Sequence, residues 1–307
     1  MSDSVFSREL ERIVGSENVM RDEPLSAHTT FKIGGPADLF VRPADVKQVE
    51  PILEACKQEG VDIHVLGLGS DLLVADEGVR GVVIHIADNL SRVFANEKTG
   101  VVLAQAGASN EQVAKAAQRA SLTGYEFASG IPGSIGGAAI MNAGAYDGQF
   151  SDVAKEVVVV TQTGDMRCIL AEDARWGYRQ SLMSDEGMVV LSAMLSLKRG
   201  DAVEIQERMD DLAQRRASKQ PLELPSAGST FKRPEGHFAG KLIQDAGLQG
   251  LRIGGAQVST KHAGFVVNVG GATAADVRAV IAAVQHRVFQ EFGVQLEPEV
   301  RMWGFAE

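Results

Sequence analysis

Residues 130–146 read Gly-Ile-Pro-Gly-Ser-Ile-Gly-Gly-Ala-Ala-Ile-Met-Asn-Ala-Gly-Ala-Tyr. This stretch contains no charged side chain and is rich in small residues. Glycine has no Cβ, so the backbone can adopt positive φ there and can come close to another group. The stretch therefore predicts either a functional loop or a site of very tight packing.

A second glycine loop, Gly67-Leu68-Gly69-Ser70-Asp71, follows an apolar run at 63–66 and precedes another at 82–86. Successive backbone N–H groups in such loops can form a cradle for an anion, although glycine is equally at home in tight turns and bulges. The third glycine of the dinucleotide-binding fingerprint is missing, because Leu72 stands in its place, and the Gly-Lys-Ser/Thr phosphate loop does not occur. Both interpretations of the loops stay open on these residues alone.

The composition is that of a globular protein with room for two domains. The chain has 307 residues, of which 45% are hydrophobic and 23% charged, and its formal net charge is -10. The charge argues against a general nucleic-acid or anionic-membrane binder. The 33 glycines are unusually many, whereas aromatic residues make up only 6%.

Cysteine and histidine usage indicates no metal site. Cys56 and Cys168 are expected to be buried thiols, one on a helix and one on a strand, and the six histidines lack ligand spacing. The first 14 residues have no apolar core and no long apolar run follows. We expect a cytoplasmic protein without membrane insertion.

Helices and strands are expected in an α/β or α+β order, with a domain boundary near Arg199-Gly200. Three helices begin with capping-box pairs, Asp45 with Gln48, Ser109 with Gln112, and Thr273 with Asp276. A further helix is expected over 201–218. The expected strands are 63–66, 82–86, 101–106, 157–160 and 189–197, with an edge strand at 296–301.

Three polar clusters complete the list of candidate segments. They are Arg175–Ser181, Ser226–Pro234 and Leu296–Arg301. Taken singly, they are typical of a solvated helix end, an ordinary loop and an edge strand. Composition and spacing alone cannot join them.

Several motifs together resemble one known family. They are Thr30–Asp38, Gly67–Asp76, Glu126–Tyr146, Tyr178–Ser181, Ser226–Pro234, Gly240–Gly264 and Leu296–Arg301. The same motifs occur in the same order in the UDP-N-acetylenolpyruvoylglucosamine reductases (MurB), flavoenzymes that make UDP-N-acetylmuramate for peptidoglycan. The resemblance covers the chain from about Leu25 to Gly304.

The resemblance implies an α+β fold. This is the two-subdomain FAD-binding fold of the vanillyl-alcohol oxidase/PCMH type, followed by a C-terminal α+β substrate-binding domain. The implied domains are 1–199, with its two subdomains split near 87–100, and 200–307. A fold of this kind explains why the dinucleotide fingerprint is absent.

It also implies the reaction, in which NADPH reduces UDP-N-acetylenolpyruvoylglucosamine through FAD in the synthesis of a cell-wall precursor. Arg179 matches the family's arginine, which stabilises the enolate formed by hydride transfer. Glu299 matches a glutamate that donates a hydrogen bond to the same enolate. Ser229 matches the proton donor.

The remaining implied site residues fall into three groups. The expected FAD-binding residues are Gly67, Gly69, Ser70, Asp71, Gly130, Pro132, Gly133, Ser134, Gly137, Asn142, Ala143 and Gly144, and the expected substrate-binding residues are Tyr178, Lys219 and Arg233. Lys241, Gln257, Lys261 and His262 fall in a family segment where a structural role is as compatible with the sequence as ligand contact. The implied partners are the enolpyruvyl nucleotide sugar and NADPH, with no metal, and the chain is expected to be a monomer.

Three departures from the family pattern stand out. Asp71 replaces a usual asparagine and is expected to face backbone donors, and Asp147 replaces a usual glycine. The segment from Ser181 to Val189 is too short for the inserted substrate-covering loop, which indicates the short form (type II). Two other hypotheses stay in competition, a flavoprotein oxidase or dehydrogenase for another substrate and a nucleotide-sugar binding protein without chemistry. The presence of Ser229 and Glu299 disfavours the second.

Overall fold

The computed structural model describes residues 3–305, which form two compact units. The first contains 3–21, 39–68 and 81–215, and the second contains 22–38, 69–80 and 216–305. Contacts within the chain thus form units that interleave along the sequence. The division into domains 1–199 and 200–307 stays a prediction, and its residues Met1, Ser2, Ala306 and Glu307 lie outside the described residues.

Antiparallel pairing dominates the first unit. Its main sheet has the order β12-β11-β13-β7-β6, with bounds Met166–Leu170, Ala154–Val160, Val189–Ser196, Val101–Gln105 and Val93–Asn96. Two small ribbons pair β9 (Gly144–Ala145) with β10 (Gly148–Gln149) and β8 (Leu122–Thr123) with β14 (Lys198–Arg199). A further sheet has the order β1-β2-β5-β3, with bounds Val19–Pro24, Pro36–Val41, Val79–His85 and Ile63–Leu66. In this sheet β3 and β5 pair in parallel.

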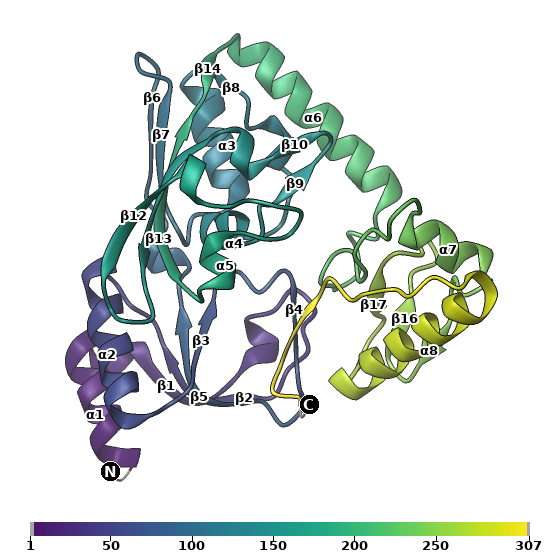
Figure 1. Cartoon of the computed structure of the whole chain (residues 1–307), viewed down its shortest axis with the longest axis horizontal. Helices are drawn as coiled ribbons and strands as arrows, with labels where there is room; N and C mark the ends of the chain where they lie inside the picture. Colours follow the sequence, from purple (N-terminus) through teal and green to yellow (C-terminus); the bar gives the residue numbers. More distant parts are fainter. Residues whose placement is uncertain (1–2, 306–307) are drawn as a thin grey trace. The chain divides into compact units, whose positions relative to one another are not determined.

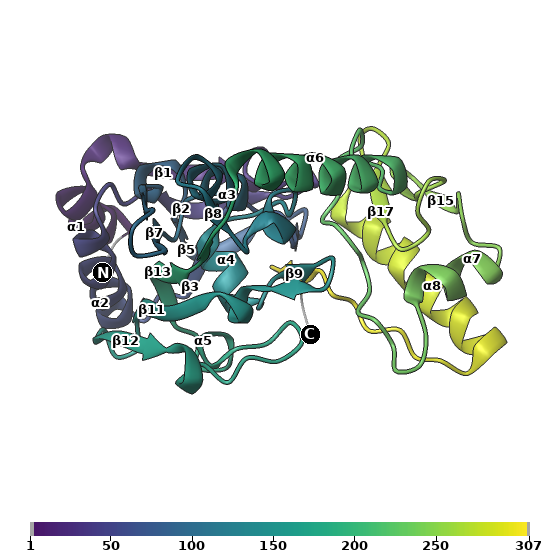
Figure 2. The same cartoon turned by 90° about the horizontal axis from the view of Figure 1, so that it is seen from above.

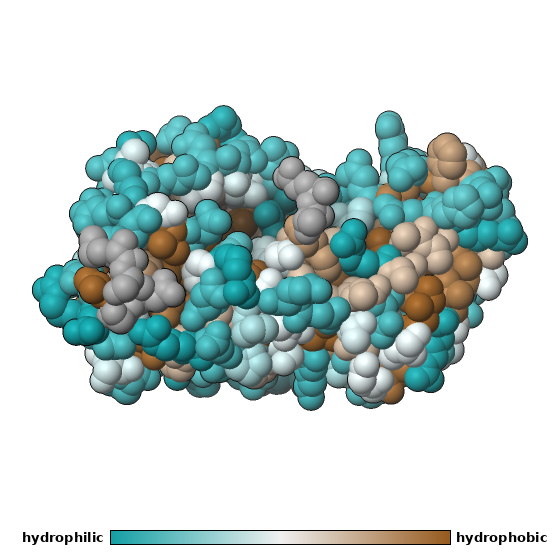
Figure 3. All heavy atoms as spheres, turned by 90° about the horizontal axis from the view of Figure 1, so that it is seen from below, coloured by the Kyte–Doolittle hydropathy of each residue, from teal (hydrophilic) through white to brown (hydrophobic). Residues whose placement is uncertain are grey.

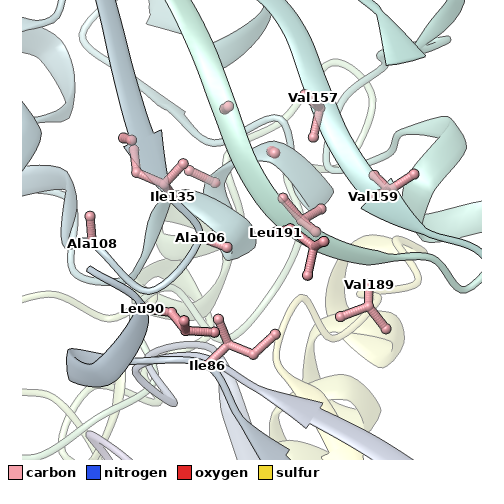
Figure 4. Close-up of a cluster of buried hydrophobic side chains, with 14 of the residues drawn as sticks. Ile86, Leu90, Ala106, Ala108, Ile135, Val157, Val159, Val189 and Leu191 are labelled. Atoms are coloured by element: carbon pink, nitrogen blue, oxygen red, sulfur yellow. The ribbon is translucent and has the colours of Figure 1, made fainter. Parts of the chain in front are cut away.

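Helices lie beside these strands in Figure 1. They are α1 (Asp3–Val14), α2 (Val49–Glu59), α3 (Asn110–Arg119), α4 (Ile135–Ile140) and α5 (Leu182–Asp185). Helix α6 (Ala202–Lys219) follows β14, and its last residues belong to the second unit. The core lies where α4 packs against β13. Figure 4 shows Ile135 of α4 together with Val157 of β11 and Leu191 of β13 among these buried side chains.

Capping motifs in the sequence mark where three of the helical segments begin. The three predicted capping boxes are confirmed, with both reciprocal hydrogen bonds present at Asp45, Ser109 and Thr273. The first of them opens a short 3-10 turn, Val46–Gln48, before α2 begins at Val49. Pro51 is tolerated because the first-turn N–H groups of a helix have no intrahelical acceptor.

The second unit is built around one long helix, α8 (Ala274–Phe292). Figures 1 and 2 show α8 beside the small antiparallel sheet β15-β16-β17, which spans Arg252–Ile253, Ala256–Val258 and Val266–Asn268. Helix α7 (Ala239–Asp245) also packs on α8. The strand β18 (Arg301–Trp303) pairs in parallel with β4 (Leu72–Val74). A separate core cluster of buried side chains fills this unit.

Asp76, just after β4, adds a long-range cap to α8. Its carboxylate accepts hydrogen bonds from the backbone N–H groups of Ala274 at 2.8 Å and Ala275 at 3.1 Å. These are first-turn donors without intrahelical acceptors, and a carboxylate at a helix N-terminus is also favoured by the helix dipole. The segment 69–80 is thereby fixed to the C-terminal part of the chain.

One prediction about the cysteines is wrong. Cys56 is buried on α2, and burial raises the pKa of its thiol to about 12. Cys168 is exposed instead, on β12 at the edge of the main sheet, where Met166 and Leu170 on the same face are exposed as well. Strand periodicity predicts which residues share a face, but it does not say whether another element covers that face.

The surface is mainly hydrophilic on the face drawn in Figure 3, where hydrophobic residues gather in small groups. No helix within residues 3–305 is long and apolar enough to cross a membrane.

Candidate active site

Gly67 and the predicted loop at 130–137 meet in the first unit. A Cβ on Gly67 would lie 2.5 Å from Oγ of Ser134, so a side chain there would displace this hydroxyl. Ser134 is buried and caps α4, its hydroxyl accepting a hydrogen bond from the backbone N–H of Gly137 at 3.4 Å. The structure thus brings together two of the segments predicted to bind FAD.

Two buried residues that no sequence motif predicted, Asn110 and Tyr125, hold the loop at 130–137 in place. The Asn110 amide group donates to the carbonyls of Ile131 and Gly133, both at 3.3 Å. The hydroxyl of Tyr125 donates to the Asn110 carbonyl oxygen at 2.8 Å, and burial raises the pKa of this phenol. The only sequence signal was the capping box at Ser109, which places Asn110 at the first position of α3.

Gly69 belongs to the second unit, and the packing of neighbouring backbone requires a glycine at this position. Its φ is +59°, and a Cβ would lie 2.1 Å from the carbonyl oxygen of His28. The backbone N–H of Thr30 donates to the Gly69 carbonyl at 3.0 Å, and the carbonyl of Asp71 accepts from Arg301 at 3.1 Å. Whether the Asp71 carboxylate faces backbone donors stays a prediction.

Ser229 and Glu299 lie on adjoining segments of the second unit. Phe231 pairs with Pro298 in an antiparallel bridge, and the backbone N–H of Glu299 donates to the Thr230 carbonyl at 2.8 Å. Ser229 is exposed, and Glu299 is half-buried. Two of the three predicted catalytic residues, 70 positions apart in sequence, are therefore neighbours in the fold.

Thr30 links the Ser229 loop to the Gly69 loop. Its hydroxyl donates to the carbonyl of Ser226 at 2.7 Å, while its backbone N–H holds the Gly69 carbonyl. Thr30 lies in the motif Thr30–Asp38, which by itself indicates only the family. Its bridging role depends on tertiary contacts that no local pattern encodes.

Arg179, the third predicted catalytic residue, lies in a tight turn of the first unit. The turn is closed by the backbone hydrogen bond from Gly177 N–H to the Gln180 carbonyl, 3.0 Å long. Arg179 itself has φ +56°, and its guanidinium carbon lies 5.0 Å from the ring centroid of Tyr178, which is 58% exposed. The turn ends where Ser181 caps α5, so the expected helix end is instead a helix start.

The other predicted substrate residues lie in the second unit. Lys219 is exposed at the end of α6, and the guanidinium of Arg233 stacks over the Phe238 ring at 4.1 Å. That ring is 61% exposed. Both predicted cations are thus at the surface of the unit.

The four residues of uncertain role make contacts with their own chain. Lys241 pairs with Asp245, the Gln257 amide donates to the Gly250 carbonyl, and the Lys261 ammonium donates to the Ala217 carbonyl. Nδ1 of His262 accepts from the backbone N–H of Gly264 at 3.1 Å, and burial lowers the pKa of this imidazole. Contacts of this kind fit a structural role, and contact of any of the four with a ligand stays a prediction.

A family model described as FAD binding domain matches residues 37–169, so the chain belongs to the class of proteins with an FAD-binding fold. The C-terminal domain of UDP-N-acetylenolpyruvoylglucosamine reductase matches residues 220–303.

Full-length relatives narrow the class to one family. The chain is 48% identical over 295 residues to the UDP-N-acetylenolpyruvoylglucosamine reductase of Alkaliphilus oremlandii and 47% identical over 295 residues to that of Clostridioides difficile, with 96% of each chain covered in both cases. It also resembles the solved structure of the Thermus caldophilus reductase (MurB), with a TM-score of 0.78 and 34% identity over 93% of this chain and 98% of that one. The chain belongs to the UDP-N-acetylenolpyruvoylglucosamine reductase family, a family of FAD-binding oxidoreductases. The predicted family and the predicted α+β FAD-binding fold are confirmed.

Proposed function

We propose that this chain reduces UDP-N-acetylenolpyruvoylglucosamine to UDP-N-acetylmuramate with NADPH, as a step of peptidoglycan precursor synthesis. The observation that carries the proposal is the pairing of the Ser229 and Glu299 segments. This pairing supports the proposal because reduction of an enolpyruvyl double bond needs a proton donor, the role we propose for Ser229 next to the Glu299 segment. We further propose that the protein acts as a cytoplasmic monomer, without nucleic acid or membrane insertion.

FAD would fit against the glycine-rich helix α4, because the packing of the chain does not itself require a glycine there. Gly137 weakens a helix, yet the chain does not crowd the place of its missing Cβ, where the nearest atom is Ser134 Oγ at 3.8 Å. Close approach of a bound molecule to the backbone would explain this glycine. When bound, FAD carries hydride from NADPH to the substrate, because no protein side chain accepts hydride.

The protein's residues handle the charge and the proton. Hydride forms a C–H bond at the terminal CH2 carbon of the enolpyruvyl group, and the electron pair of the double bond moves to the neighbouring carbon and its carboxylate. Arg179 is a permanent cation suited to stabilising this enolate, and Glu299, protonated or through water, donates a hydrogen bond to it. Ser229 then protonates the carbon and regains its proton from solvent. NADPH is oxidised to NADP+, and the double bond is reduced.

The purified protein tests this proposal directly. We expect a yellow protein that bleaches anaerobically with NADPH and regains its colour when the enolpyruvyl nucleotide sugar is added. A colourless protein that takes up no FAD would contradict every flavin hypothesis. Bleaching without recovery on addition of the substrate would favour an oxidase or dehydrogenase for another substrate.

Gly137→Ala distinguishes a cofactor cradle from a merely tight turn. Alanine is the better helix former by about 1 kcal/mol, so the FAD-free protein should be up to about 1 kcal/mol more stable. If the backbone of Gly137 approaches FAD, the added Cβ should also raise the dissociation constant of FAD at least tenfold. The measurements are thermal unfolding and titration of FAD-free protein with FAD.

Gly136→Ala is the matched control. Its Cβ would lie 3.1 Å from the Cβ of buried Ala106, so this substitution should lower stability instead. FAD affinity of the folded fraction should stay near the wild-type value. Unchanged FAD affinity in Gly137→Ala would mean that the glycine serves no close approach.

A further inference from the structure

The turn that carries Arg179 is held from one side by the residues at the end of α4. Nε1 of Trp176 donates to the Ala139 carbonyl at 3.1 Å, and Oγ of Ser181 donates to the Ile140 carbonyl at 2.8 Å. Between these two contacts, Nδ2 of Asn142 donates to the Gly177 carbonyl at 3.1 Å. Trp176 before the turn, Gly177 at its start and Ser181 after it are therefore each fixed by a separate hydrogen bond.

Asn142 is built into the protein as the central contact. It is 3% exposed and has φ +41°, a left-handed conformation that asparagine tolerates better than most residues. Its Oδ1 accepts a hydrogen bond from the backbone N–H of Ser151 at 3.0 Å. This contact fixes the amide orientation, so Nδ2 must point to Gly177, with a second acceptor at Oε1 of Gln149, 3.3 Å away.

The turn needs such support because Arg179 is itself left-handed, at φ +56°. A residue other than glycine is strained in this region and persists there only where its surroundings hold it. The carbonyl that Asn142 holds belongs to Gly177, whose N–H closes the turn around Arg179. Losing the Asn142 contact would let the turn relax and the guanidinium move.

We propose that Asn142 is a positioning residue for Arg179, setting where its guanidinium stands when the enolate forms. This inference rests on the proposed function. It assigns the Asn142 side chain to protein contacts, although the family resemblance implies that Asn142 binds FAD. Helix α4 would then approach the cofactor at Gly137 and, through residues at its C-terminal end, hold the turn that carries Arg179.

Asn142→Asp tests the inference with little change in shape. Aspartate tolerates the same backbone conformation and keeps an oxygen for the Ser151 N–H, but it cannot donate to Gly177 and sets a carboxylate against that carbonyl. We expect wild-type flavin content and a bleaching rate with NADPH within twofold of wild type. Recovery of colour with the enolpyruvyl substrate should slow at least tenfold. Hydrogen exchange of the amides at 177–181 should accelerate, whatever the activity.

Two further variants make the result specific. Gln149→Glu adds the same charge next to Asn142 while keeping an acceptor for it, and should recover colour at the wild-type rate. In an Arg179→Ala background, Asn142→Asp should slow recovery by less than twofold more, because its effect acts through the arginine. Equal slowing in both backgrounds would overturn the positioning role.

Other outcomes separate this inference from the proposed function. If the wild type is not recoloured by substrate, the proposed function fails and the inference falls with it. If the wild type recovers normally and Asn142→Asp does too, only the positioning role fails. A flavin-poor Asn142→Asp protein would place the amide on the cofactor and would also overturn it.

Discussion

Ser229→Ala is expected to bleach with NADPH at the wild-type rate and then to recover its colour with the enolpyruvyl substrate about 10²–10⁴ times more slowly, the range that general acid catalysis contributes. The hydroxyl is a weak acid, so its value lies in being placed where the carbon accepts the proton. Ser229 follows Gly228, whose φ is +76°, and precedes Thr230, which is hydrogen-bonded through its backbone on both sides, to Gly264 and Glu299. Stopped-flow absorbance of the flavin measures both half-reactions separately.

Ser226→Ala is the matched control for this variant. Ser226 lies in the same loop, and the contact it makes with Thr30 uses its backbone carbonyl, which the substitution leaves intact. Both half-reactions should therefore run at wild-type rates in this control. Normal recovery of colour in Ser229→Ala would show that another group supplies the proton.

The sequence was sufficient to predict those elements whose signals are local. A capping box needs only residues three positions apart, and the alternation over 189–197 marks β13 without any knowledge of its partners. Cys168 shows what such local signals do not predict. Its strand was expected, but its exposure depends on whether another element covers that face of the sheet, and a local pattern carries no such information.

The candidate site was predictable only through the family resemblance. Three polar clusters far apart in sequence gave no sign of belonging together, and the pairing of the Ser229 and Glu299 segments is a tertiary contact. The residues that hold the site, such as Asn110, Tyr125 and Thr30, were missed for the same reason. Their hydrogen bonds join positions that no short-range pattern relates.

The glycine loops illustrate a different difficulty, because one residue type serves two purposes. Gly69 has positive φ and no room for a Cβ, so the chain's own packing requires it. Gly137 has an ordinary helical conformation, and a Cβ there would meet the chain only at an ordinary van der Waals distance, 3.8 Å from Ser134 Oγ, so the chain's packing does not require it. The glycine content of the sequence does not distinguish these two kinds of glycine. Only the surroundings of each missing Cβ separate a tight turn from a place left open for a ligand.

Arg179→Ala is expected to slow the recovery of colour with substrate by about 10²–10³-fold, the loss that follows removal of one group that stabilises a developing oxyanion. Bleaching by NADPH should remain within a few fold of wild type, because the guanidinium is assigned to the enolate. Arg179→Lys should recover only part of the lost rate. Lysine keeps the positive charge, but an ammonium group cannot reproduce the planar fork that matches a carboxylate.

Arg175 offers an unusually close control for this prediction. It lies four residues earlier, is also left-handed with φ +46°, and its guanidinium pairs with Glu186 at 2.8 Å. Arg175→Ala therefore imposes the same change of side chain on the same kind of backbone, yet should leave both half-reactions close to wild type. If the two alanine variants slow recovery equally, the loss comes from the strained turn. If only Arg179→Ala slows it, and added guanidinium ion restores part of the rate, the arginine acts through its charge and its place.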